Sequence, residues 1–204
     1  MLNEFERNER MHQLGASDIH KIFNFNNKGA FDLWQEKMGL IEKPQIETQS
    51  MTAGNLLEED CLVFFFNRKS IKDYVLNERV EHRDIKNFVV STDGLFDDIP
   101  VENKTKNMDG FAKMTSPERN HILQLHAQMS CLNSDHGYIV YNAVTDEDLI
   151  NPLMYIPSEL KQEVFEIKAD IDLIKEIESR AKYFLWCVEY KRRPTEQDYI
   201  SRLF

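Results

Sequence analysis

The stretch Ser91-Thr-Asp-Gly-Leu-Phe-Asp-Asp-Ile-Pro-Val-Glu-Asn-Lys-Thr105 decides the fold of this chain. Side chains alternate between the two faces of a β-strand, so Glu102 and Lys104 would point to the same side of one strand. Asp93 follows a short apolar run and precedes Gly94, a typical turn residue. The pattern predicts a hairpin, with Gly94 as its turn residue, that brings Asp93 beside Glu102.

Two carboxylates and an ammonium in one place can hold a hard divalent cation and polarise a water molecule. An aspartate followed by Glu-x-Lys resembles the PD-(D/E)xK nucleases. So short a pattern also arises by chance, as Glu166-Ile-Lys168 shows. The alternative is an edge hairpin that carries a solvated salt bridge. The rest of the chain must decide between this hairpin and a nuclease site.

Composition sets limits on the class of protein. A chain of 204 residues fits one domain, 1–204, with a core of its own. Hydrophobic residues make up 42% and charged residues 29%, as in ordinary soluble globular proteins. The net charge of −10 argues against a broad DNA-coating surface. A narrow basic channel in an acidic body remains compatible with a nuclease.

The three cysteines, Cys61, Cys131 and Cys187, stand far apart in apolar stretches. This spacing predicts buried free thiols in a reducing cytoplasm, without a zinc site or an iron–sulfur cluster. The charged N-terminus does not look like a signal peptide, and no apolar run reaches membrane length. We therefore expect no membrane partner.

Hydrophobic periodicity predicts helices, then strands, a helix, strands and a final helix, which is an α/β order with a mixed sheet covered by helices. Five helices are expected. The first has Ser17 as its N-cap, the second runs from Ala30 to Met38 and ends at Gly39, and the third has Thr52 as its N-cap. The fourth runs from Ser116-Pro117 to about Leu132, and the fifth runs from Asp170 or Asp172 and ends before Pro194. Expected strands are 72–82, 87–91, 101–105 and 137–141; residues 164–168 fit a strand or a helix, and 42–50 and 107–113 are expected loops.

The motifs together resemble the YqaJ-type viral recombinase nucleases, the family of phage lambda exonuclease. The resemblance runs from about Arg10 to about Pro194. Its motifs are Arg10 with Gly15-Ala-Ser17, Phe31-Asp-Leu-Trp-Gln-Glu-Lys-Met-Gly39, Gly54-Asn-Leu-Leu-Glu58, Ser91-Thr-Asp-Gly94, Glu102-Asn-Lys104 and Gln124. Thr92 stands where the family has proline. Six motifs in the family's order favour the nuclease over the edge hairpin.

The resemblance implies a metal site. Asp93 and Glu102 would bind Mg²⁺, with Mn²⁺ as a possible substitute, and the backbone carbonyl of Asn103 would be a third ligand. Glu58 would bind or orient a metal or its water from its helix. Its alternative role is that of a first-turn carboxylate favoured by the helix dipole.

The resemblance also assigns the remaining roles. Lys104 would hold or polarise the attacking water, and Gln124 would position Lys104 or that water. Arg10 and Ser17 would bind the 5′-phosphate of the strand; the alternatives are a surface charge and a plain N-cap. For Gln128 and the histidines, such as His121 and His126 beside Gln124, we expect structural roles, and for Asp97 and Asp98 a place in a loop.

The implied fold is an α/β restriction-endonuclease-like mixed β-sheet flanked by helices. The implied activity is 5′-to-3′ exonuclease action on linear double-stranded DNA, which releases 5′-mononucleotides and leaves 3′ single strands for phage-type recombination. Implied partners are double-stranded DNA ends, a single-strand annealing protein and further copies of the chain in a trimeric ring, in the cytoplasm of a bacterial host. Alternatives are an endonuclease or single-strand nuclease on the same scaffold, and an inactive DNA-end-binding or protein-binding module.

Overall fold

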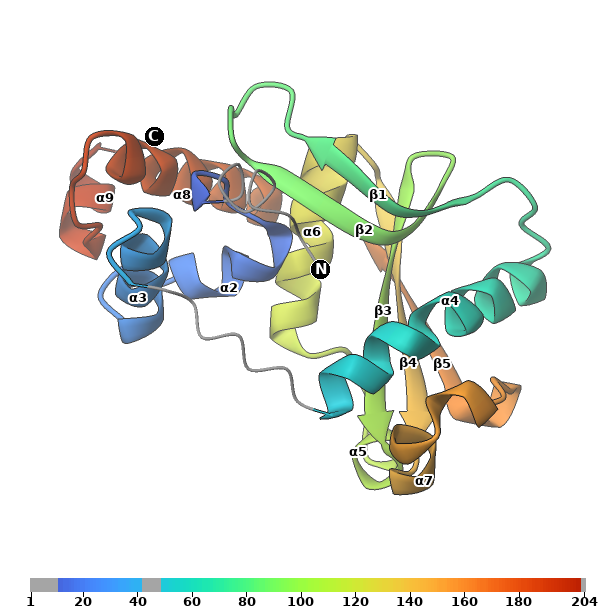
Figure 1. Ribbon diagram of the computed structural model, residues 1–204. Helices are drawn as coiled ribbons and strands as arrows, with labels where there is room; N and C mark the ends of the chain where they lie inside the picture. Colours follow the sequence, from blue (N-terminus) through green and yellow to red (C-terminus); the bar gives the residue numbers. More distant parts are fainter. Residues whose placement is uncertain (1–10, 42–48, 203–204) are drawn as a thin grey trace.

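A five-stranded mixed sheet forms the centre of the computed structural model, which describes residues 11–41 and 49–202 (Figure 1). The strand order is β1-β2-β3-β4-β5. β3 and β4 are parallel, and the other neighbouring pairs are antiparallel. The strands are β1 (Val75–Glu81), β2 (Val89–Phe96), β3 (Ile99–Asn107), β4 (His136–Val144) and β5 (Gln162–Lys168). The predicted α/β class, with a mixed sheet flanked by helices, is confirmed.

Two helices cover opposite faces of the sheet (Figure 1). The parallel pair β3–β4 needs a crossover, which runs through α5 (Met108–Ala112) and α6 (Arg119–Leu132). Alternate strand residues face each helix: Val101 and Val140 pack against α4 (Gln49–Lys69), whereas Ile139 and Tyr141 pack against α6. The central strands are therefore buried on both faces.

Five further helices form a second layer beside α6. They are η1 (Ala16–Asp18), α2 (Ile19–Ile22), α3 (Lys28–Lys37), α8 (Ile171–Glu189) and α9 (Glu196–Arg202). Leu14 joins this layer to the sheet, because its N–H donates to the carbonyl oxygen of Asn87 at 2.8 Å, next to the start of β2. Ile22, Leu33 and Phe184 are among the buried residues of the shared core.

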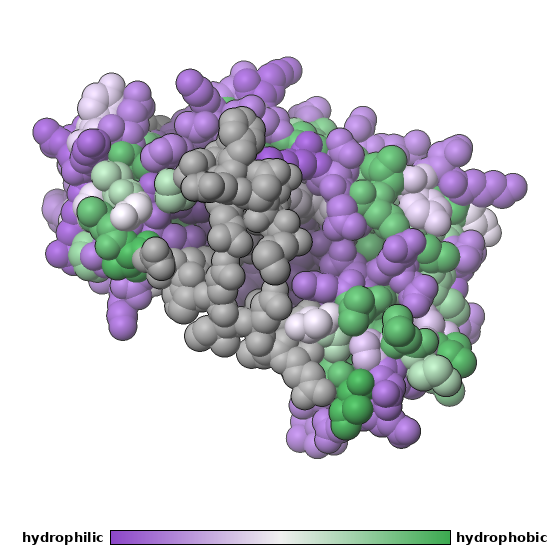
Figure 2. Space-filling model, viewed as in Figure 1, coloured by the Kyte–Doolittle hydropathy of each residue, from purple (hydrophilic) through white to green (hydrophobic). Residues whose placement is uncertain are grey.

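An apolar segment is exposed at the other side of the molecule. It runs from the end of α7 (Asp146–Ile150) through η2 (Pro152–Met154) to η3 (Glu159–Lys161). Its most exposed members are Ile150, Leu153, Met154, Ile156 and Leu160. Figure 2 shows hydrophobic residues gathered in the region where Figure 1 places α7 and the chain after it. Such contiguous apolar surface is typical of protein–protein contacts.

In the described part of the chain, no helix is long and apolar enough to cross a membrane.

The hairpin turn lies at Asp97 and Asp98, so the prediction of a turn at Gly94 was wrong. The two aspartates have φ values of 47° and 62°, which short polar side chains tolerate in two-residue hairpin loops. Gly94 lies inside β2 and pairs with Val101. A Cβ on Gly94 would stand 2.9 Å from Cζ of Phe66. Glycine is therefore needed there because α4 packs closely on the strand.

Three predicted helix starts were wrong. Ser17 is not an N-cap, because it lies inside η1, which Gly15 flanks. α4 begins at Gln49, ahead of Thr52, and residues 49–50 are helical; the rest of the expected loop, 42–48, lies outside the described residues. α6 begins at Arg119 with Glu118 as its N-cap, and the Glu118 N–H donates to the hydroxyl oxygen of Tyr141 at 3.1 Å.

Other boundaries are mostly close to the predictions. Gly39, with φ of 66°, ends α3, and the side chain of Asp170 caps α8. Residues 164–168 are a strand, whereas 108–112 form the short α5 in place of the expected loop. α8 ends at Glu189, ahead of Pro194, and the sequence did not indicate α9. Cys61 and Cys187 are buried and Cys131 is half-buried, and all three are free thiols.

We expect Gly94→Ala to destabilise the protein, because the new methyl group would overlap the Phe66 ring. Overpacking of this kind costs about 1–3 kcal/mol in the free energy of unfolding. Thermal unfolding would measure the loss. Gly15→Ala is the control, because a Cβ there would meet its nearest atoms at 3.9 Å. Equal melting temperatures for the two variants would contradict the packing argument.

Candidate active site

The candidate site lies where β2 and β3 separate. Their ladder runs from Phe96↔Ile99 to Gly94↔Val101 and has no further pair among the described residues. Figure 1 shows β1 and β2 turning away from β3. At the end of the ladder the Asn103 N–H donates to Oδ2 of Asp93 at 2.8 Å. A side-chain bond thus replaces the backbone ladder and holds Asp93 at the gap between the strands.

Glu102 is a carboxylate in the interior, only 1% exposed. It points toward α6 from the same side of β3 as Lys104, as the spacing predicted. Its Oε1 accepts hydrogen bonds from Lys104 Nζ at 2.5 Å and from Gln124 Nε2 at 2.6 Å. Its Oε2 accepts one from Gln128 Nε2 at 2.6 Å. A buried charge needs such partners, so these donors fix the orientation of the Glu102 carboxylate.

Gln128 is a member of the site that the sequence did not identify as one. Its amide nitrogen also donates to the carbonyl oxygen of Ser91 at 2.9 Å, so it links Glu102 to β2. Its Oε1 is buried and has no hydrogen-bond partner within the described ranges. Gln124 and Gln128 stand one helical turn apart, and this i, i+4 spacing was the signal that could have paired them.

The charges in the gap do not balance. Burial raises the pKa of Asp93 well above its usual range, and the charges of Glu102 and Glu58 raise it further. The pKa of Glu58 is also raised, by burial first and then by Glu102. Burial alone would lower the pKa of Lys104, but the surrounding carboxylates outweigh it and raise that pKa. Three carboxylates thus share one ammonium, which is the charge environment that suits a divalent cation.

The oxygen donors at the gap fit a hard metal ion. Within residues 11–41 and 49–202, no three acidic, imidazole or thiol side chains stand close enough to chelate a metal by themselves. A cation would therefore be held by Asp93 and Glu102 together with carbonyl or water oxygens. Asn103 lies between the two pocket-facing residues of β3, so its carbonyl remains the expected third ligand.

Glu58 reaches the gap from α4. Gly54, one turn earlier, lies close over β3, because a Cβ there would meet Oγ1 of Thr105 at 3.5 Å. The half-buried Glu58 carboxylate interacts electrostatically with Glu102 and Asp93 although α4 covers the other face of the sheet. The separation of β2 and β3 allows this approach. The structure therefore brings Glu58 to the same charge cluster.

A row of buried amides supports the site from the α4 face. Asn142 Nδ2 donates to Oδ1 of Asn103 at 2.7 Å, and Gln162 Nε2 donates to Oδ1 of Asn142 at 2.9 Å. Gln162 Nε2 also donates to the carbonyl oxygen of Cys61 at 3.1 Å. The row crosses β3, β4 and β5 and ties α4 to the sheet. The sequence gave no sign of it, because its members are far apart in the chain.

Of the two expected 5′-phosphate ligands, Ser17 alone lies among the described residues. Arg10 lies outside the described residues. Ser17 is exposed in η1, which packs on α6 and β2. Their assignment stays a prediction. Asp97 and Asp98 are exposed turn residues, as expected of loop carboxylates.

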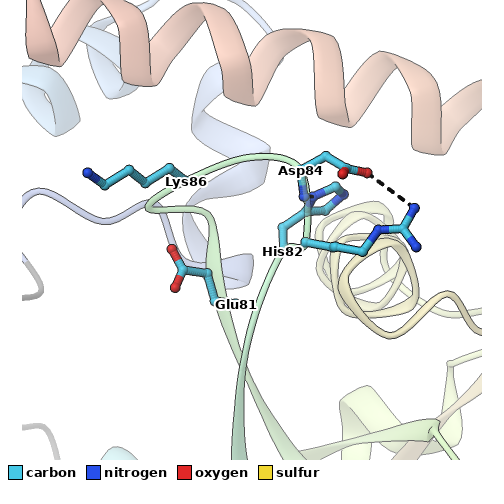
Figure 3. A pocket seen from close by; sticks show the side chains of 5 residues that line it. Glu81, His82, Asp84 and Lys86 are labelled. Carbon is cyan, nitrogen blue, oxygen red and sulfur yellow. Dashed lines mark hydrogen bonds and ion pairs between the residues drawn. The ribbon is translucent and has the colours of Figure 1, made fainter.

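A surface recess elsewhere has a structural explanation. It lies on the connection between β1 and β2 and is lined by Glu81, His82, Arg83, Asp84 and Lys86 (Figure 3). The ring nitrogen Nδ1 of His82 accepts hydrogen bonds from the N–H groups of Asp84 at 3.1 Å and Ile85 at 3.2 Å. The imidazole thus holds the loop together, and none of the candidate site residues lines the recess.

We expect Asp93→Asn to stabilise the metal-free protein at neutral pH. A carboxyl whose folded-state pKa is raised contributes stability at acidic pH and loses it as the pH rises through that pKa. The amide removes this repulsion and can still accept the Asn103 N–H. The melting temperature should rise by about 2–4 °C for each kcal/mol of repulsion that the substitution removes. Asp97→Asn, in the exposed turn, is the matched control and should leave the melting temperature unchanged. A fall for Asp93→Asn would show that the carboxylates do not repel one another.

Comparison with known proteins agrees with this fold. No match was found among curated proteins. The fold is similar to that of an alkaline exonuclease from Laribacter hongkongensis, with 22% identity, a TM-score of 0.74, and coverage of 95% of this chain and 93% of that chain. The same enzyme in complex with dAMP shows 20% identity, a TM-score of 0.74 and coverage of 98% and 97%. A phage related exonuclease from Haemophilus somnus 129PT shows 18% identity, a TM-score of 0.66 and coverage of 88% and 96%.

At these identities the structural similarity establishes the fold. The family assignment comes from the sequence: residues 7–136 match the family described as the YqaJ-like viral recombinase domain. This match covers more than half of the 204 residues, and the chain therefore belongs to the YqaJ-like viral recombinase family.

Proposed function

We propose that the protein is a Mg²⁺-dependent exonuclease that digests linear double-stranded DNA from the 5′ end, releases 5′-mononucleotides and leaves 3′ single strands for recombination. The observation that carries the proposal is the gathering of Asp93, Glu102 and Lys104 where β2 and β3 separate. Family membership supports the recombination role. The structure of a similar exonuclease with dAMP, a mononucleotide, supports the product class.

The site residues have different proposed roles in catalysis. Mg²⁺, when bound, would polarise a water molecule and stabilise negative charge on the phosphate. The metal ion would be held by Asp93, Glu102 and the Asn103 carbonyl. Glu58 would bind or orient the metal ion or its water. Mn²⁺ prefers the same oxygen ligands and is a possible substitute. The Lys104 ammonium would donate a hydrogen bond to the attacking water or to a phosphate oxygen.

Gln124 acts on Lys104 through a shared atom. Both donate to Oε1 of Glu102, so the amide limits the positions that the ammonium can take. This arrangement supports a role for Gln124 in positioning Lys104. Arg10 and Ser17 would bind the 5′-phosphate of the strand.

Partners follow from the same proposal. Double-stranded DNA ends are the substrate, and a single-strand annealing protein would receive the 3′ strand. A trimeric ring of subunits would surround the duplex and retain it between cleavage steps. The exposed apolar segment after α7 supports association with other proteins. The bacterial cytoplasm is the proposed location.

We expect Lys104→Ala to abolish digestion of a 5′-phosphorylated linear duplex in Mg²⁺, with the fold intact by circular dichroism. Lys161→Ala is the control, because Lys161 is also a half-buried lysine in an ion pair, with Asp148. Digestion at the wild-type rate by Lys104→Ala would overturn the site assignment.

A closed circular duplex belongs in the same experiment. Cutting of the circle would identify an endonuclease on this scaffold. If the folded wild type cut neither substrate and bound no Mg²⁺ in calorimetry, a DNA-end-binding or protein-binding module would replace the proposal.

We expect Gln128→Met to weaken Mg²⁺ binding by about 10–100-fold in calorimetry, because residues that orient a metal ligand have effects of that size. The substitution keeps the volume but leaves Glu102 Oε2 without its amide donor. Ser130→Ala is the control: it removes another side-chain donor of α6 whose acceptor, Glu178, lies outside the site, and all donors to Glu102 remain. Equal Mg²⁺ affinities for the two variants would show that Gln128 has only a structural role.

A further inference from the structure

Four side chains form a cluster beside the candidate site that the proposed chemistry does not use. They are Lys106, Glu118, His121 and Tyr141. Lys106 points to the same side of β3 as Glu102 and Lys104, because strand side chains alternate. His121 precedes Gln124 by about one turn of α6 and shares its side of the helix. Tyr141 is the neighbour of Lys104 in β4. The cluster therefore continues the layer that contains the metal-ligand candidates.

Hydrogen bonds connect His121 to Tyr141 and Glu118. The Tyr141 hydroxyl oxygen accepts the Glu118 N–H at 3.1 Å and lies 2.7 Å from Nδ1 of His121. In the tautomer in which this hydroxyl donates to Nδ1, the imidazole proton is on Nε2. Burial, together with the charge of Lys104, lowers the pKa of His121 to about 4. At neutral pH this tautomer of His121 therefore presents a neutral Nε2–H donor.

The Glu118 carboxylate lies between Lys106 and this donor. Its Oε1 accepts a hydrogen bond from Lys106 Nζ, and its Oε2 lies 4.0 Å from Nε2 of His121. The hydrogen bond to Lys106 is the main reason why the pKa of Glu118 is lowered. The Glu118 side chain is 52% exposed, so it can move into solvent when another anion takes its place.

We propose that Lys106 and His121 form a second phosphodiester-binding subsite, which takes the phosphate next to the one at Asp93 and Glu102. Glu118 is its internal occupant and leaves when a DNA strand binds. The inference rests on the proposed DNA substrate. Lys106 lies about 6.6 Å along β3 from Lys104, at ~3.3 Å per residue, a step suited to successive phosphates of an extended strand. An ammonium beside a neutral N–H donor binds an anion by charge and by direction.

The test is duplex binding without divalent metal, so that no cleavage occurs. A fluorescent 5′-phosphorylated duplex with a short single-stranded end is titrated in EDTA at several salt concentrations, and anisotropy gives the dissociation constant. Lys106→Ala should weaken binding several-fold and reduce the slope of log K against log salt by about 1. His121→Phe should weaken binding with the slope unchanged, because it removes a neutral donor.

Glu118→Gln should bind the duplex more tightly than the wild type, which misfolding cannot imitate. The chain offers matched controls. Lys161→Ala removes a lysine that also pairs with a carboxylate and lies over a tyrosine ring, but outside the site. Glu163→Gln makes the same charge change as Glu118→Gln at an exposed position of β5.

The subsite is overturned if Lys106→Ala behaves like Lys161→Ala, or if Glu118→Gln binds no more tightly than Glu163→Gln. The cluster would then be a surface ion pair. Failure of the nuclease proposal looks different: the wild type would leave the linear duplex uncut in Mg²⁺, while the anisotropy comparison between variants could still be made.

Discussion

Burial of the Glu102 carboxylate is the constraint on which the rest of the site depends. A charge in the interior is tolerated only where hydrogen-bond donors replace water, and removal of one partner is costly. Lys104 supplies a donor from the same strand, and Gln124 and Gln128 supply two from α6. Gln128 also donates to the carbonyl oxygen of Ser91, so α6 is held against β3 through Glu102 and against β2 through Ser91. The crossover helix therefore holds the strands in position where they separate.

The opposite face of the sheet provides the second constraint. Asn103, Asn142 and Gln162 form a polar row across three strands, and the row ends on a backbone carbonyl of α4. Its hydrogen bonds fix α4 along the sheet, and with it Glu58. Asn103 belongs to both faces, since its side chain joins the row and its N–H holds Asp93. Side chains that must act together thus stand on strands and helices rather than on loops, which gives them a defined geometry.

The site is also a source of instability. Asp93 and Glu58 have raised pKa values because burial and the charge of Glu102 disfavour their charged forms. A cation would relieve both effects, so stability and metal binding are linked. Polar groups continue from this region along β3 and α6 to Lys106 and His121. A surface that joins a carboxylate cluster to cationic and neutral donors can hold a phosphate chain in one direction, although the net charge of the whole protein is −10.

The sequence by itself determined the order of the main helices and strands, the mixed sheet and the shared side of Glu102 and Lys104, because strand alternation and helical periodicity are local properties. It also identified Gln124 as a candidate site residue, through a motif resemblance. Only the tertiary structure decided the turn at Asp97 and Asp98, since close packing of Phe66 in α4 gives Gly94 a different purpose. The N–H of Glu118, the N-cap of α6, has its acceptor on Tyr141, a residue of β4. The role of Gln128 and the row from Asn103 to Gln162 depend on register and packing between distant segments, which no local pattern encodes.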